Sequence, residues 1–92
     1  MKATIILDNK EVSVTASLRP IGRGVYRCEV EVGGTTIAAT TKDSELSDRY
    51  KELSSQPWGN ATEEAQREVV ADIVGVIEIA KGEELSEAVA RL

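Results

Sequence analysis

The sequence predicts an α+β protein, in which an antiparallel sheet of about four strands, formed by two hairpins, packs against one main helix with short accessory helices. Residues 3–41 alternate apolar and polar side chains around turn residues, which is typical of strands with one buried face. Residues 60–82 instead repeat apolar side chains at helical spacing. A chain of 92 residues suits one core, so we expect a single domain over residues 1–92.

The first hairpin is predicted from residues 3–7 and 11–18, joined through Asp8-Asn9-Lys10. Pairing Leu7 with Val12 gives the sheet one apolar face, and places Ile6 with the hydroxyl side chains of Thr4, Ser13 and Thr15 on the other face. A turn displaced by one residue would change this register.

The second hairpin spans residues 25–41 and is predicted from the turn at Gly33-Gly34. Pairing Val32 with Thr35 fixes its register and gives one apolar and one polar face. Cys28 falls on the apolar face, which favours a small core residue over a reactive thiol. The apolar face pairs Val30/Ile37, Cys28/Ala39 and Tyr26/Thr41, and the polar face pairs Glu31/Thr36, Glu29/Ala38 and Arg27/Thr40.

The connection over residues 19–24 is predicted to be a loop, because Pro20 cannot donate to a ladder and two glycines permit sharp turns. Together with Arg27 on the polar face, it places Arg19, Arg23 and Arg27 near one end of the sheet. Two interpretations stand: arginines that keep a loop solvated, or a contact site for phosphate or carboxylate groups, which guanidinium binds in bidentate fashion.

Two segments after the hairpins have the features of a helix and a loop. Apolar side chains recur at i, i+4 and i+7 between residues 42 and 53, which predicts a short helix with Asp43 or Ser44 as its N-cap. Residues 54–59 form a loop, whose Trp58 is either a lid over the core edge or an anchor for a partner. The recurring apolar residues are Leu46, Tyr50 and Leu53.

The main helix is predicted to begin at Asn60, where Glu63 completes the spacing of a capping box, and to end at Gly82 as its C′ residue. Residues 73–80 are rich in β-branched side chains, so a strand is the alternative there. Residues 83–92 predict a short amphipathic terminal helix. The core-facing stripe of the main helix is Ala65, Val69, Ile73, Val76, Ile77 and Ala80.

The charge is unevenly distributed along the chain. The net charge of −5 divides into +2 over residues 1–42 and −7 over residues 43–92. An acidic whole disfavours sequence-independent nucleic-acid binding, which depends on neutralising phosphates. A single cysteine and the lack of an apolar run near the roughly 20 residues of a membrane helix indicate a cytoplasmic protein.

The residue types exclude most catalytic chemistry. With no histidine and one cysteine, the chain has no histidine-based triad, no histidine-bearing metal site and no thiolate zinc site. The carboxylate pairs Glu63/Glu64 and Glu83/Glu84 lie where helix starts favour acids. We therefore expect no catalytic residue, no cofactor and no metal, and a binding protein rather than an enzyme. The candidate partner-binding residues are Arg19, Arg23, Arg27, Glu29, Glu31, Glu64, Glu68 and Asp72.

The whole chain resembles small phage-encoded anti-CRISPR proteins, and is most similar to inhibitors of type I-F surveillance complexes. The stretches that carry the resemblance are MKATIILDNKEVSVTASL, YRCEVEVGGTTIAATT and AQREVVADIVGVIEIAKGEE. The resemblance implies a non-enzymatic protein in the host cytoplasm that binds the crRNA-guided complex, contacts its backbone subunits and prevents target DNA from binding or pairing with the guide. It implies no small-molecule substrate, no membrane partner and little binding to free nucleic acid.

Two alternative functions remain open at this point. A hairpin followed by a helix resembles the later part of a double-stranded-RNA-binding domain, although acids stand where such domains place lysines. A phage structural or assembly protein that dimerises through an open sheet edge is the other alternative.

Overall fold

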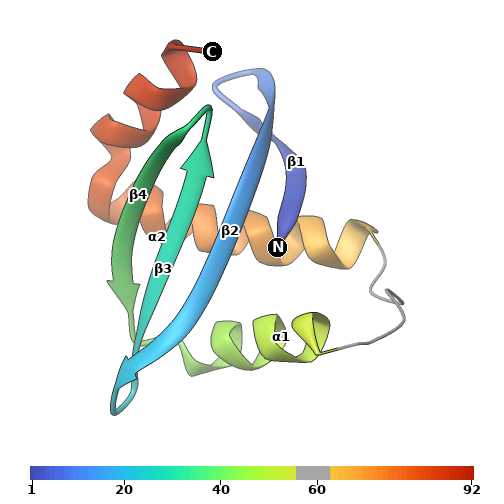
Figure 1. Ribbon diagram of the computed structural model, residues 1–92, viewed down its shortest axis with the longest axis vertical. Helices are drawn as coiled ribbons and strands as arrows, with labels where there is room; N and C mark the ends of the chain where they lie inside the picture. Colours follow the sequence, from blue (N-terminus) through green and yellow to red (C-terminus); the bar gives the residue numbers. More distant parts are fainter. Residues whose placement is uncertain (56–62) are drawn as a thin grey trace.

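The computed structural model describes residues 1–55 and 63–92, and it confirms the predicted α+β fold. The described residues form one antiparallel sheet in the order β1-β2-β3-β4 and two helices (Figure 1). Helix α2 crosses behind the sheet, and α1 packs beside α2. The expectations for Trp58 and Asn60 lie outside the described residues. The elements are β1 (Lys2–Leu7), β2 (Lys10–Gly22), β3 (Val25–Val32), β4 (Thr35–Thr41), α1 (Ser44–Ser54) and α2 (Glu63–Ala90).

The β3–β4 hairpin has the predicted register, with Val32 opposite Thr35 and Val30 opposite Ile37. Gly33 and Gly34 both have positive φ angles, 55° and 84°, which side chains with a Cβ rarely adopt. The face predicted to be apolar is the buried one, and its side chains contact the helices. Its buried members are Cys28, Val30, Val32 and Ile37.

The predicted register of the β1–β2 hairpin is wrong by two residues. Leu7 pairs with Lys10 and not with Val12, because the turn contains only Asp8 and Asn9. Both turn residues have positive φ angles, 50° and 64°, a conformation that Asp and Asn tolerate better than other side chains. A shift of two residues keeps every side chain on its face, so the predicted apolar face is still the buried one.

The loop predicted over residues 19–24 is also wrong, because most of it is strand. β2 continues to Gly22, β3 starts at Val25, and a register shift between Pro20 and Gly22 marks a bulge. Ala16 exchanges backbone hydrogen bonds with Met1 on the β1 side. Pro20 lies four residues further along β2, so its backbone groups point to the same side as those of Ala16 and away from β3. The N–H that proline lacks would therefore not have bonded to β3, and its absence removes no hydrogen bond from this ladder.

Helix α1 begins as the sequence predicts. Its N-cap is Asp43, whose Oδ1 accepts a hydrogen bond from the Leu46 backbone N–H at 3.0 Å. Leu46 is buried, and Tyr50 and Leu53 are partly buried against the same core. The side chains that recur at helical spacing therefore dock α1 against the sheet and α2.

Helix α2 is helical through residues 73–80, which excludes the strand alternative for this segment. The predicted end of the main helix beside Gly82 is confirmed, because the backbone leaves the helical conformation at Lys81, whose φ and ψ are −139° and 40°. The predicted short terminal helix then follows, and α2 as a whole runs to Ala90 with this break inside it. The break redirects the last turns so that Leu85 and Val89 also reach the core. The buried stripe is wider than predicted and includes Val70 and Val74, because the helix packs against β1 as well as the central strands.

Cys28 is fully buried, as the sequence predicts for a core residue. Burial raises the pKa of its thiol from the ordinary 9.0 to about 11, and the Asp43 carboxylate adds to the rise. The unfolded chain would release this proton near pH 9 and the folded chain only near pH 11. The stability contributed by the neutral thiol is therefore present below about pH 9 and is lost as the pH rises toward 11.

We expect the free energy of unfolding of the wild type to fall by about 2 to 3 kcal/mol more than that of a Cys28→Ala variant between pH 8 and pH 11. Urea unfolding of both proteins at each pH measures this difference, and the variant controls for every other group that titrates in the range. Equal losses in the two proteins would show that the thiol ionises alike in both states.

Candidate partner-binding surfaces

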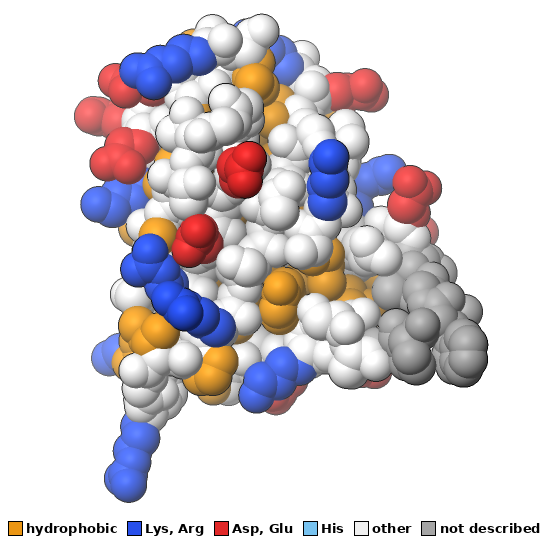
Figure 2. Space-filling model, in the orientation of Figure 1, with side chains coloured by type: hydrophobic (Ala, Val, Ile, Leu, Met, Phe, Trp, Pro, Cys, Tyr) orange, Lys and Arg blue, Asp and Glu red, His pale blue; other side chains and the backbone are white. Residues whose placement is uncertain are grey.

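Five of the eight candidate residues lie on the outer face of the sheet, which points away from the helices, or in the turn next to it. Figure 2 shows this face, where uncharged polar side chains and backbone dominate and charged side chains stand apart. Glu29 lies opposite Ser17, and Glu31 lies opposite Thr15. All four point outward, because their neighbours Cys28 and Val30 point into the core.

Arg19 and Arg27 are directly opposite each other on this outer face. Arg23 stands beyond them in the exposed turn between β2 and β3, where Gly24 has a φ angle of 66°. Figure 2 shows Lys and Arg side chains gathered toward this end of the sheet. The structure thus brings two of the predicted arginines side by side and places the third at the tip of the same hairpin.

Arg27 is partly neutralised within the sheet. Its Nε lies 3.5 Å from Glu29 Oε2, and both side chains are about 40% exposed. An ion pair with this exposure is weak, worth up to about 1 kcal/mol, so a partner with a better anion could replace it. Arg19 and Arg23 have no ion pair within the described residues.

The acidic candidates on α2 form an exposed row at i, i+4 and i+8: Glu64, Glu68 and Asp72. With a rotation of about 100° per residue, the centre of this row lies roughly opposite the centre of the buried stripe. The acidic row therefore points away from the sheet, toward solvent.

Asp72 already has a partner inside the protein. Its Oδ2 accepts a hydrogen bond from Arg49 Nη1 at 2.6 Å, which ties α2 to α1. This bond raises the pKa of the Arg49 guanidinium, so the arginine stays charged. Glu64 and Glu68 form no ion pair within the described residues and are the acids of the row that remain available to a partner.

The candidate residues therefore fall on two opposite faces. The arginines, Glu29 and Glu31 belong to the outer face of the sheet, whereas the acidic row belongs to the far side of the helix layer. One flat partner surface cannot contact both faces at once. Sequence reasoning could not find this separation, because it depends on which face of the sheet the helices cover.

The surface also has shallow hollows that sequence reasoning missed. One lies between α1 and α2 and is lined by residues that include Arg49, Leu53 and Glu68. A longer groove follows β1 beside α2. Within residues 1–55 and 63–92, no group of His, Cys, Asp and Glu side chains is arranged to hold a metal ion.

Neither described helix is both long enough and apolar enough to cross a membrane. Comparisons with protein-family models, with curated proteins and with solved structures find no match to this chain. The candidate surfaces are therefore interpreted from their own charge and geometry.

Proposed function

We propose that this protein is a non-enzymatic inhibitor of a type I-F CRISPR surveillance complex, which it binds so that target DNA cannot bind or pair with the guide. The observation that carries the proposal is the solvent-facing acidic row on α2, in which Glu64 and Glu68 have no ion pair among the described residues. Carboxylates spaced one helical turn apart can occupy lysines that otherwise hold DNA phosphates. The resemblance of the chain to such inhibitors supports the same function.

Electrostatics favours this competition. A protein with a net charge of −5 is attracted to the basic channels through which nucleic acid passes, and charge complementarity raises the association rate. The arginines on the outer sheet face then have a separate role, because they lie on the opposite side of the protein. Arg19 and Arg27 fit guide-RNA phosphates or acidic side chains of another subunit. Contacts on both faces suit a position between neighbouring backbone subunits.

The proposal predicts stable association with the assembled complex. Purified protein mixed with a type I-F surveillance complex should coelute with it in size-exclusion chromatography, and the association should weaken as salt increases because charge pairs are screened. The same protein should not shift free guide RNA or free duplex DNA. Elution of the protein apart from the complex at low salt would contradict the proposal.

The alternative of an RNA-binding module is less well supported. Such a module would place cations at the start of the helix that faces phosphate, whereas α2 begins with Glu63 and Glu64 and continues with Glu68. A salt-sensitive shift of free RNA by the isolated protein would favour this module over the inhibitor.

A further inference from the structure

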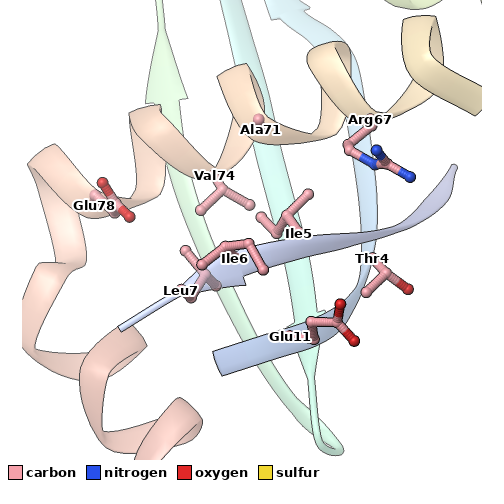
Figure 3. Close-up of a pocket in the computed structure, with 9 residues that line it drawn as sticks. All are labelled: Thr4, Ile5, Ile6, Leu7, Glu11, Arg67, Ala71, Val74 and Glu78. Atoms are coloured by element: carbon pink, nitrogen blue, oxygen red, sulfur yellow. The ribbon is translucent and has the colours of Figure 1, made fainter. Parts of the chain in front are cut away.

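A groove follows the open edge of β1. Within the described chain β1 pairs only with β2, and its other side faces this groove. Three adjoining hollows make it up: the central one, of about 440 Å³, shares Thr4 and Arg67 with one neighbour and Leu7 and Glu78 with the other. Figure 3 shows Ile5 pointing toward Val74 on α2, with Arg67 and Glu78 at opposite ends of the central hollow.

The backbone along this groove is arranged to pair with another strand. Met1 exchanges both hydrogen bonds with Ala16, so the odd-numbered residues of β1 direct their backbone groups to β2. The even-numbered residues Lys2, Thr4 and Ile6 consequently direct their N–H and C=O groups into the groove. Ile6 also keeps 64% of its surface exposed, and its side chain lies on the outer face of this edge. An open strand edge with an exposed large apolar side chain is a template for strand addition.

The charged side chains of the groove differ between its two ends. At one end Lys2 and Arg67 lie with Glu11 and Glu63, and at the other end Asp8 lies with Glu78. Counting these groups, the first end carries two positive and two negative charges, a sum of 0, and the second end carries −2. An antiparallel second copy would place the two cations at the first end of each groove, Lys2 and Arg67, near the two acids at the second end of the other.

We propose that the protein forms a twofold symmetric dimer by antiparallel pairing of β1 with β1 of a second copy, which makes one continuous eight-stranded sheet. Thr4 of one copy then exchanges hydrogen bonds with Ile6 of the other, and the two Ile5 residues face each other at the axis. In this register the hydrogen bonds between the copies are formed by the even-numbered residues of both strands, whose backbone groups point into the groove. It also brings Arg67 of each copy toward Glu78 of the other. The dimer is independent of the proposed inhibition.

A second copy fits the groove better than an unrelated segment does, because one twofold operation pairs the backbone groups and brings Arg67 and Glu78 of opposite copies together twice. Sedimentation equilibrium of the full chain should therefore give twice the monomer mass of 9.9 kDa. Arg67→Glu alone and Glu78→Arg alone should each raise the dissociation constant of the dimer on the order of ten-fold, because each places like charges together at both ends. The double variant should restore it. Glu87→Arg, an exposed acid outside the groove contacts, is the matched control.

A second pair of variants tests the strand edge itself. Thr4→Pro removes an N–H that points into the groove without removing a β1–β2 hydrogen bond, so it should give a folded monomer. Thr40→Pro is the matched control, because Thr40 stands at the corresponding parity on β4, the other edge of the sheet. Circular dichroism verifies the fold of each variant.

The outcomes of these experiments distinguish a second copy of the protein from other occupants of the groove. A wild-type monomer at millimolar concentration would overturn the proposal and leave the groove to an extended segment of another protein. A dimer that Thr40→Pro dissociates and Thr4→Pro does not would also overturn it, by placing the interface on β4. Failure of the double charge variant to recover the dimer would contradict the proposed register.

Discussion

Replacement of Ile73 by aspartate is expected to leave the protein unfolded at 25 °C in the absence of denaturant. Ile73 lies in the middle of α2 with no exposed surface, packed between the helix and the apolar face of the sheet. The change removes an isoleucine side chain from the core, which costs about 2 to 5 kcal/mol, and adds a carboxyl group that finds no polar partner there. A domain of this size has on the order of 5 to 14 kcal/mol of total stability.

Ile79→Asp is the matched control for this prediction. Ile79 belongs to the same helix but has 92% of its surface exposed, so the same substitution should change the free energy of unfolding by less than about 0.5 kcal/mol. Far-UV circular dichroism and urea unfolding of both variants measure the difference. Similar stability of the two variants would contradict the placement of α2 on the sheet.

The double variant Glu64→Lys/Glu68→Lys is expected to weaken association with the surveillance complex on the order of a hundred-fold. Both residues face solvent and form no ion pair among the described residues, so the reversal should leave the fold intact. At the proposed interface the two lysines would meet the basic side chains that the carboxylates matched, and such like-charge contacts cost several kcal/mol. Biolayer interferometry with immobilised complex measures the change.

Glu83→Lys/Glu87→Lys supplies the matched control, because it makes the same change in net charge on the redirected last turns of α2. It should bind nearly as tightly as the wild type. If both double variants lose affinity equally, net charge and not the acidic row determines binding. Asp72 is left unchanged in these tests, because its removal would also release Arg49.

Reversal of Arg19 and Arg23 to glutamate tests the opposite face, and we expect it to weaken inhibition as well. These two positions avoid the Arg27–Glu29 ion pair, so a loss of binding would report on a partner contact and not on the sheet. Unchanged inhibition by the folded variant would remove the arginine surface from the site and leave the acidic row as the contact.

Period-two patterning and turn chemistry made most of the sheet predictable. Gly33-Gly34 identifies a two-residue turn, so the register of β3 and β4 follows from it. Asp8-Asn9 makes the same kind of turn, but its boundaries are ambiguous in sequence because Lys10 also suits a turn, and the predicted register was two residues off. Because the error was two residues, every side chain stayed on its predicted face of the sheet, and the predicted core faces are correct.

The break within α2 was predictable, whereas the grouping of the candidate residues was not. Gly82 is a normal helix stop signal, and the helix breaks beside it at Lys81, after which Leu85 and Val89 of the next helical segment pack into the core. The charges of Arg27, Glu68 and Asp72 are known from the sequence. Their ion-pair partners, and the side of the protein on which each lies, depend on tertiary contacts. The Arg49–Asp72 bond joins residues 23 positions apart and has no local signal.

Target-DNA binding by a purified type I-F surveillance complex, measured by electrophoretic mobility shift with and without this protein, tests the proposed function most directly. We expect equimolar or excess protein to abolish the DNA shift when it is added before the DNA, and the Glu64→Lys/Glu68→Lys variant to leave the shift intact. An undiminished shift in the presence of excess folded protein would contradict the proposed inhibition.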